Sequence, residues 1–245
     1  MNFYTAAITA VCLLPFVCYA QDGPTIACED VPPVFWCKNK NISELCNVTD
    51  KCNTYFKKSN EKKILLTVLY EILCQSCAQV ISGPLKEVYE TRKDQVDIEL
   101  VPFGNARYNE DGSLSCQHGV EECNGNRYEA CAINFIEDYF PFIACVEGNI
   151  ESFDFEATAK KCYADLKTPD DVVKQIEECY NGQLGHDLIK ANSERSVSAE
   201  GIKYDFVPWI FINNVSSSRF SLNSMFDNNL LTFIDEWHVK GELTL

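Results

Sequence analysis

Two cysteines separated by two residues follow an apolar segment, and this arrangement constrains the fold and the chemistry of the chain more than any other feature. Cys74 and Cys77 stand just beyond the β-type segment 64–70. A helical pattern continues to about residue 92, with Pro84 as a kink or a restart, and a second β-type segment spans 96–102. Strand, helix and strand in this order predict a βαβ unit with parallel strands. A Cys-x-x-Cys at such a strand-to-helix junction is typical of a dithiol redox site.

The reactive form of such a site is a thiolate, because the thiol itself is a poor nucleophile. At an ordinary pKa of about 8.5, only about one cysteine in 3,000 is ionised at pH 5. No Lys or Arg lies between residues 63 and 86, and Glu71 has the wrong sign to help. We therefore expect backbone N–H groups at the helix start, or a residue brought in by the fold, to stabilise the anion. This predicts Cys74 as nucleophile and Cys77 as the resolving thiol; a permanent disulfide and half of a zinc site are the structural alternatives.

Cysteine content and charge indicate a lumenal protein. Residues 1–20 have the apolar core and small final residue of a signal peptide, and their removal leaves 12 of the 14 cysteines. So many cysteines behind a signal predict an oxidising compartment and several disulfides. The formal net charge of −15 disfavours nucleic acid as a partner. No later segment is long and apolar enough to predict a transmembrane helix.

The chain divides into a small piece and a larger domain. Four cysteines fall within residues 21–58, and the run 35–39, continuing to Cys52, resembles a saposin A-type module. A generic disulfide-stapled leader is the alternative. The larger domain is predicted at 62–240, with a helical insertion at about 116–195 that carries six cysteines. Six cysteines allow about 15 pairings, and the sequence does not choose among them. A strand at 207–212 and an amphipathic helix at about 224–239 complete the domain.

The insertion begins with a specific motif. Residues 116–131 match C-Q-H-G-x-x-E-C-x-x-N-x-x-x-x-C throughout. This string resembles the signature of the gamma-interferon-inducible lysosomal thiol reductases, and segments 69–74, 100–106, 129–131 and 207–209 agree with the same family. The resemblance covers residues 62 to about 240. It departs from the family in the Gln-Ser pair between the two dithiol cysteines, where Gly-containing pairs are common.

The resemblance implies an α/β fold: a thioredoxin-like domain with a helical, disulfide-rich insertion. It implies reduction of protein disulfides at acidic pH in the endolysosomal lumen or outside the cell, through a mixed disulfide. Cys74 and Cys77 would be catalytic, no metal or organic cofactor would be needed, and a small thiol would regenerate the dithiol. In thioredoxin-like folds a cis-proline faces the dithiol, so Pro208 and the backbone of Val207 are predicted to bind substrate. Pro208 is otherwise an ordinary strand-start proline.

Other assignments remain open at this stage. His118 is either a cation near the dithiol or a cap of the first insertion helix, and Glu121 and Glu122 suit a helix start. Three Asn-x-Ser/Thr sequons predict glycosylation at Asn41, Asn47 and Asn214. A secretory-pathway disulfide isomerase or oxidase and a non-catalytic secreted binding protein are the alternative functions. The sequence leaves the oligomeric state and the natural substrate open.

Overall fold

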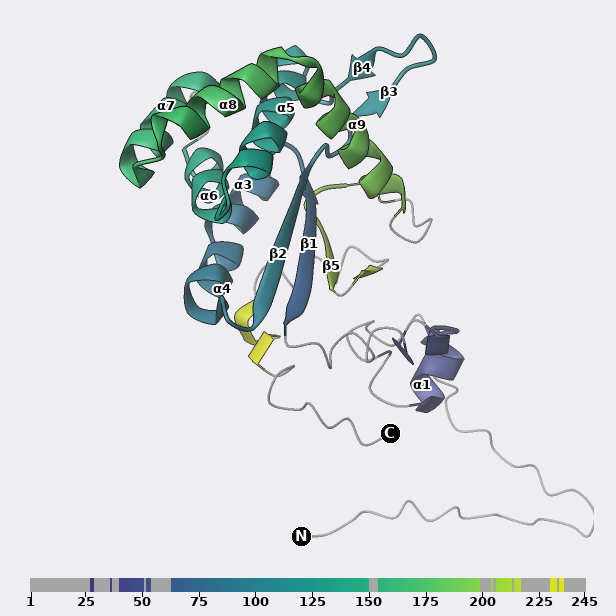
Figure 1. Cartoon of the computed structure of the whole chain (residues 1–245). Helices are drawn as coiled ribbons and strands as arrows, with labels where there is room; N and C mark the ends of the chain where they lie inside the picture. The colour runs from purple at the N-terminus through teal and green to yellow at the C-terminus, as the bar shows by residue number, and fades with distance from the viewer. Residues whose placement is uncertain are drawn as a thin grey trace, which may run out of the picture.

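Figure 1 shows the computed structural model of the chain. The structure describes residues 27–28, 36, 40–50, 52–53, 63–149, 154–198, 204, 206–212, 214–216, 230–232 and 234–235. The predicted signal peptide at 1–20, most of the segment 21–58 and most of the helix expected at 224–239 lie outside the described residues.

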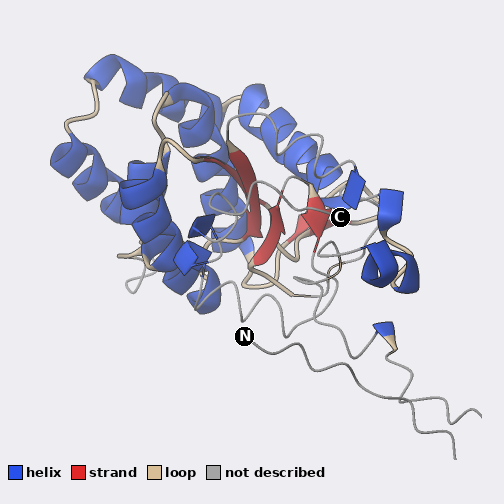
Figure 2. Cartoon of the chain, turned by 90° about the horizontal axis from the view of Figure 1, so that it is seen from below, coloured by secondary structure: helices blue, strands red, loops and turns tan. Residues whose placement is uncertain are grey.

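A sheet forms the centre of the larger domain, and its strand order in the described chain is β2-β1-β5-β6. The first two strands are parallel, and the others are antiparallel to their neighbours: β1 (Ile64–Tyr70), β2 (Val96–Pro102), β5 (Trp209–Ile212) and β6 (Val215–Ser216). Six of the seven residues of β1 are buried, because helices cover the sheet (Figure 2). The predicted βαβ unit is confirmed. The predicted strand at 207–212 begins two residues later, at Trp209.

Two helices connect the parallel strands. Helix α3 (Gln75–Ser82) ends at Gly83, and α4 (Pro84–Arg92) starts at once with proline in its first turn. Proline is tolerated there because the first helical N–H has no partner within the helix. The helix predicted to run to residue 92 is therefore two helices, and Pro84 marks the restart.

The insertion is helical, as predicted, and it lies at the end of the sheet where β1 and β2 finish (Figure 1). Its helices are α5 (Val120–Phe135), α6 (Phe140–Glu147), α7 (Phe155–Leu166), α8 (Asp170–Asn181) and α9 (Gln183–Ser198). Its six cysteines form three disulfides: Cys116–Cys123, Cys131–Cys179 and Cys145–Cys162. The second joins α5 to α8 and the third joins α6 to α7, so the helices are linked covalently as well as packed.

The segment before the insertion is more ordered than the sequence predicts. Residues 104–119 are rich in Gly, Asn and Asp, which favours loop, but they contain a short hairpin of β3 (Arg107–Tyr108) and β4 (Leu114–Ser115). Its turn includes Gly112 with φ of 81°, and the Asp111 carboxylate accepts a hydrogen bond from the Ser113 N–H. A local aspartate-to-backbone contact of this kind stabilises turns.

The described part of the N-terminal piece has one helix, α1 (Lys40–Leu45). A disulfide joins Cys28 to Cys46, and Cys52 is also disulfide-bonded. These bonds agree with a short segment that is stabilised by disulfides. They do not distinguish the saposin A-type module from a generic leader, and the boundary at residue 58 stays a prediction.

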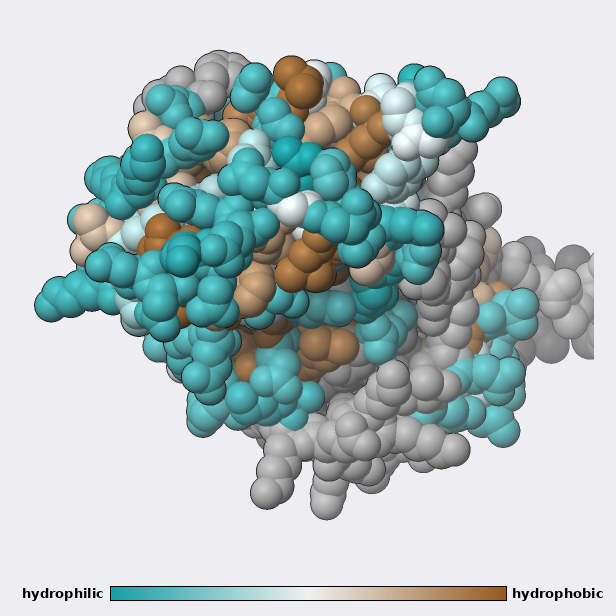
Figure 3. All heavy atoms as spheres, turned by 45° about the horizontal axis from the view of Figure 1, so that its top comes forward, coloured by the Kyte–Doolittle hydropathy of each residue, from teal (hydrophilic) through white to brown (hydrophobic). Residues whose placement is uncertain are grey.

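The outer surface of the insertion is mostly hydrophilic, with small separate hydrophobic patches (Figure 3). Among the described residues, none of the helices has the length and apolar character needed to cross a membrane. Near the C-terminus, Leu230 and Ile234 are buried, and the Asp235 carboxylate accepts hydrogen bonds from Arg92 of α4. This fragment of the predicted last helix thus packs on the domain.

Candidate active site

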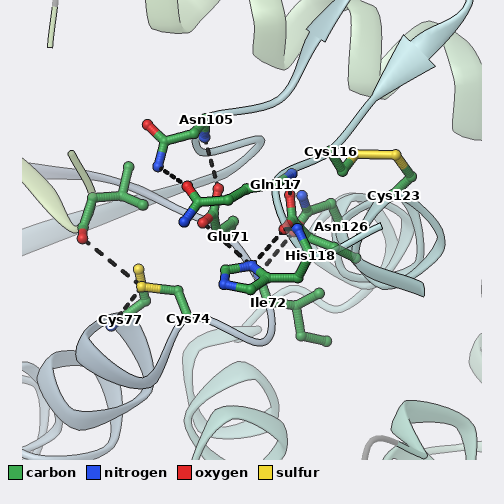
Figure 4. Close-up of polar contacts among 12 residues, drawn as sticks. Glu71, Ile72, Cys74, Cys77, Asn105, Cys116, Gln117, His118, Cys123 and Asn126 are labelled. Carbon is green, nitrogen blue, oxygen red and sulfur yellow. Dashed lines mark hydrogen bonds and ion pairs between the residues drawn. A yellow bond between two sulfur atoms is a disulfide. The ribbon is translucent and has the colours of Figure 1, made fainter. Parts of the chain in front are cut away.

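Cys74 lies at the junction between β1 and α3, where it is the N-cap residue of the helix. Its sulfur accepts a hydrogen bond from the Cys77 N–H at 3.4 Å (Figure 4). Within the part of the chain that the structure describes, Cys74 and Cys77 are the free cysteines. Cys74 is partly exposed and Cys77 is buried. A thiol at a helix N-cap with a second thiol one turn later is the arrangement that the sequence predicts.

The two thiols have opposite pKa shifts. The pKa of Cys74 is lowered to about 6, first by the hydrogen bond from the Cys77 side chain, and against the opposing effect of burial. The N–H groups of Cys77 and Ser76 and the charge of His118 lower it further. Burial, followed by the proximity of Cys74, raises the pKa of Cys77 well above its ordinary value. The site therefore has one accessible thiolate and one protected thiol, and the predicted roles of helix amides and of a residue brought in by the fold both contribute.

The predicted proline turn also lies against the dithiol. The peptide bond between Val207 and Pro208 is cis, and the Cys74 thiol donates to the Val207 carbonyl oxygen at 3.8 Å. Chain segments 133 residues apart thus meet at one sulfur. This geometry is the one predicted for a proline turn facing a Cys-x-x-Cys.

The loop at 116–123, where the signature motif begins, is anchored by one buried glutamate. The Glu122 carboxylate accepts hydrogen bonds from the N–H groups of Gln117 at 3.3 Å and His118 at 2.6 Å. The same carboxylate lies 2.7 Å from His118 Nδ1. The Cys116–Cys123 disulfide closes this loop. The imidazole therefore pairs with a side chain of α5 and does not cap the helix, so the capping interpretation of His118 is wrong.

Asn126, another signature residue, connects α5 to the turn between β1 and the dithiol. Its Oδ1 accepts a hydrogen bond from the Ile72 N–H at 2.9 Å, and both residues are buried. The neighbouring Gly125 has no space for a side chain, because a Cβ there would overlap Ile72. These contacts hold α5 against the segment that leads to Cys74.

Glu71 completes the cluster from the other side. It is buried, and its carboxylate accepts a hydrogen bond from the Asn105 N–H at 2.7 Å. Gly104 adopts φ of 58°, and a Cβ there would overlap the Glu71 carboxylate. Burial raises the pKa of Glu71 to about 7, with the Asn105 hydrogen bond opposing the shift and the charges of Glu122 and Cys74 adding to it. The carboxyl is therefore protonated in acid, when it puts no negative charge beside Cys74.

Glu71, His118 and Glu122 bring three possible metal-ligand atoms within 4.8 Å of one another. Both carboxylates already accept backbone N–H groups, and Glu122 also pairs with the His118 ring. We interpret the group as a hydrogen-bonded cluster that holds the loop beside the dithiol.

Sequence reasoning missed a second set of buried acids. Glu129 of α5 accepts a hydrogen bond from the Tyr70 hydroxyl at 2.7 Å, and burial raises the pKa of Glu129 to about 8. Glu147 of α6 is buried, and its carboxyl oxygens have no hydrogen-bond partner among the described residues. Burial, with the charges of Glu129 and Cys74, raises its pKa well above the ordinary value. A glutamate in a helical segment ordinarily faces solvent, so the helical pattern marks neither residue as buried, although Glu129 lies in a segment that agrees with the family.

The predicted glycosylation residues lie on other elements. Asn41 is exposed in α1, and Asn47 follows that helix with φ of 53°. Asn214 lies in the turn between β5 and β6, where its Oδ1 accepts a hydrogen bond from Arg195 at 3.0 Å. Glycosylation at these three positions remains a prediction.

Comparison with known proteins places this arrangement in a family. The gamma-interferon-inducible lysosomal thiol reductase of Carassius auratus is 30% identical to this chain over 215 residues, which are 86% of the chain and 81% of that protein. The chain belongs to the gamma-interferon-inducible lysosomal thiol reductase family. The family model, described as gamma interferon inducible lysosomal thiol reductase (GILT), matches residues 65–166. The gamma-interferon-responsive lysosomal thiol protein of Arabidopsis thaliana is 32% identical over 155 residues, 62% of each chain.

Membership in this family fixes the class of the protein. The chain is a disulfide oxidoreductase with a thioredoxin-like fold and a helical, disulfide-bonded insertion. The non-catalytic binding protein considered from the sequence is therefore excluded. Among solved structures, alpha-DsbA1 of Wolbachia pipientis aligns with a TM-score of 0.47 and 17% identity, over 74% of this chain and 91% of that one.

Proposed function

We propose that this chain reduces disulfide bonds of protein substrates in an acidic lumen, with Cys74 as nucleophile and Cys77 as resolving thiol. The observation that carries the proposal is the lowered pKa of Cys74, about 6, at a partly exposed helix N-cap. At pH 5 a thiol with this pKa is ionised in about one molecule in eleven, compared with about one in 3,000 for an ordinary cysteine. Nucleophilicity falls as the pKa falls, but less steeply than the thiolate population rises.

In the proposed reaction, the Cys74 thiolate attacks a substrate disulfide and forms a mixed disulfide. Cys77 then attacks the Cys74 sulfur, which releases the reduced substrate and leaves a bond between Cys74 and Cys77. A small thiol restores the dithiol. The backbone of Val207, next to Pro208 and in contact with the Cys74 sulfur, is proposed to pair with an extended segment of the substrate.

The proposed compartment is the lumen of lysosomes or endosomes, or the extracellular space. Its support is the predicted signal peptide, the disulfides of the described chain and the lysosomal names of the relatives from Carassius auratus and Arabidopsis thaliana. The segment 21–58 is proposed to be a separate saposin A-type module, and Asn41, Asn47 and Asn214 are proposed glycosylation sites.

The test is reduction of a disulfide-bonded protein such as insulin at about pH 5 and about pH 7, because thiolate populations diverge over this range. Wild type should be active at the lower pH. Cys74→Ser should be inactive, and Cys77→Ser should accumulate a mixed disulfide with the substrate. An inactive wild type at pH 5, or an active Cys74→Ser variant, would refute the proposal.

One observation favours a second candidate, a disulfide oxidase or isomerase. A lowered pKa of the nucleophile stabilises the reduced dithiol and so makes the disulfide more oxidising. Equilibration of the Cys74–Cys77 pair with glutathione buffers separates the two functions. A potential near that of thioredoxin, about −270 mV, supports a reductase, whereas one near that of DsbA, about −120 mV, supports an oxidase.

A further inference from the structure

The His118 side chain lies between a buried carboxylate and the dithiol. Its Nδ1 is 2.7 Å from Glu122 Oε2 and 3.6 Å from Glu71 Oε1. Figure 4 shows the imidazole on the side of Cys74, with the ring nitrogen that does not contact Glu122 directed away from the carboxylates and toward that cysteine. The positive charge of His118 also acts on the Cys74 sulfur. The ring is thus available to the reacting sulfur through Nε2.

Glu122 fixes the orientation of this ring. Its carboxylate is fully buried and receives the N–H groups of Gln117 and His118, so it has little freedom to move. A carboxylate at Nδ1 holds the proton on that nitrogen and leaves Nε2 to exchange a proton with a reactant. Nucleophile, histidine and orienting acid are the three parts of a common catalytic arrangement.

Disulfide reduction needs a proton on the substrate sulfur that departs beside Cys74. When the Cys74 thiolate attacks, one substrate sulfur departs, and an alkyl thiolate is a poor leaving group because its conjugate acid has a pKa near 8.5. A proton donated during bond breaking makes departure easier.

We propose that His118 is a catalytic acid that donates its Nε2 proton to the first departing substrate sulfur, and that Glu122 positions it for this transfer. The proposal rests on the proposed reductase function and adds a residue to its mechanism.

The reaction balances with this donor. In the first step the bond between Cys74 and substrate sulfur forms, the substrate disulfide breaks, and the departing sulfur takes the proton of the His118 imidazolium, which becomes neutral. In the second step the bond between Cys74 and Cys77 forms, Cys77 loses its proton and the second substrate sulfur gains one. The substrate disulfide has gained two electrons, the dithiol has lost two, and a proton from solution restores the imidazolium.

The other titratable groups facing this site are less suited to the role. Glu71 and Glu122 are buried, with side chains 1% and 0% exposed, whereas the His118 side chain is 36% exposed. Of these three side chains, the histidine is therefore the one that an incoming substrate can contact. Glu147, whose charge acts on both thiols, is buried in α6, and Cys77 is buried in α3.

The test uses the dependence of the rate on the leaving group. The reduced full-length protein reacts with hydroxyethyl disulfide, whose leaving sulfur needs a proton, and with bis(nitrophenyl) disulfide, whose aromatic thiolate departs without one. The readout is the ratio of the first rate constant to the second at about pH 5. Any change in the charge of Cys74 affects both reactions and cancels in this ratio.

The His118→Asn variant keeps a donor near the Nδ1 position and removes the titratable ring. The ratio should fall about 100-fold in this variant, the lower limit for loss of a general acid. His186→Asn is the matched control, because His186 pairs with Arg127 on the insertion and should leave the ratio unchanged. Glu122→Gln should lower the ratio in the same direction by misorienting the ring. An unchanged ratio in His118→Asn would overturn the proposal.

Wild type provides a measurement that does not depend on the folding of a variant. Its ratio should be lower at about pH 8 than at about pH 5, because the proposed donor acts only while it carries a proton. A ratio that stays flat across this range would also overturn the proposal. Both probes are small disulfides, so the result does not depend on whether the protein reduces insulin.

Discussion

The low pKa of Cys74 should depend on the side chain of Cys77, and this can be tested with two substitutions that differ in one atom. Its largest cause is the hydrogen bond from the Cys77 side chain. Cys77→Ala removes that donor and keeps the backbone N–H that Cys74 also accepts. Cys77→Ser removes the resolving thiol but keeps an O–H donor. Only the alanine variant should therefore raise the pKa of Cys74.

The size of the effect follows from the energy of one charge-assisted hydrogen bond. Such a bond contributes about 1.5–3 kcal/mol, which corresponds to about 1–2 pKa units. Cys74 is partly exposed, so water replaces part of the lost interaction and the lower end applies. The pKa should rise from about 6 to about 7. At pH 5 the thiolate population then falls about tenfold, and the higher nucleophilicity of the remaining thiolate limits the loss of alkylation rate to about threefold.

The assay is the rate of alkylation of Cys74 by iodoacetamide across the pH range, followed by mass spectrometry of the Cys74 peptide. The midpoint should move upward in Cys77→Ala and stay in place in Cys77→Ser. If both variants keep the wild-type midpoint, the helix amides and His118 hold the charge without this donor and the reasoning is refuted. If the midpoint of Cys77→Ser shifts as far as that of Cys77→Ala, a hydrogen-bond donor at residue 77 does not control the pKa of Cys74.

Three more predictions concern the buried carboxyls and the disulfides. Glu71→Gln keeps an acceptor for the Asn105 N–H and removes a charge that forms above about pH 7, so the pKa of Cys74 measured by alkylation should fall by under about one unit. Because the pKa of Glu129 is raised to about 8, the folded chain keeps a proton that the unfolded chain releases above about pH 4.5. The free energy of unfolding should therefore fall as the pH rises toward 8, by up to about 1.4 kcal/mol per pH unit. In thermal unfolding, the stability of Glu129→Gln should depend less steeply on pH than that of wild type. Replacing Cys131 and Cys179 together by alanine opens a bond across 48 residues and should lower the free energy of unfolding by about 4 kcal/mol in urea titrations.

The parts of the site that could be predicted are those fixed by short spacing. The position of Cys74 at a helix start follows from an apolar strand, and the helical periodicity places Cys77 one turn later. The cis bond before Pro208 and its meeting with Cys74 followed from comparison with thioredoxin-like folds, and the structure has both. Local patterns encode the positions of the two cysteines because neighbouring residues determine them, whereas the contact between residues 133 apart was predicted from the fold resemblance.

The parts that could not be predicted depend on contacts between distant segments. Glu122 is at a helix start, as predicted, but its carboxylate turns back to hold His118 and Gln117, which requires the loop closed by a disulfide. Glu147 has the same sequence context as an exposed helical glutamate, and it is buried only because α6 packs inside the folded domain. The pairing of six cysteines likewise depends on how five helices pack, which no spacing rule gives.

Glu71 shows why sign alone is a poor guide to the electrostatics of the dithiol. A carboxylate three residues before Cys74 would oppose the thiolate, so the sequence alone predicts that Glu71 disfavours ionisation of Cys74. Burial raises its pKa to about 7, so below that pH the group is neutral and the objection disappears. Burial likewise raises the pKa of Glu147 well above its ordinary value, and the charge that this carboxyl would carry when ionised lies close enough to affect both thiols.

The influence of these acids on Cys74 changes with pH, whereas that of a lysine beside the dithiol would not. A lysine keeps its charge from pH 5 to pH 8 and would favour the thiolate throughout that range. Here the N–H groups of α3 favour the Cys74 anion at every pH, and the buried carboxyls oppose it only once they ionise. As the pH falls below about 7, the opposing charge is removed before Cys74 itself is protonated at about 6. Burial of Glu71 beside the helix N-cap therefore removes a charge that would oppose the Cys74 anion in the acidic range, which is consistent with the proposed reduction of disulfides there.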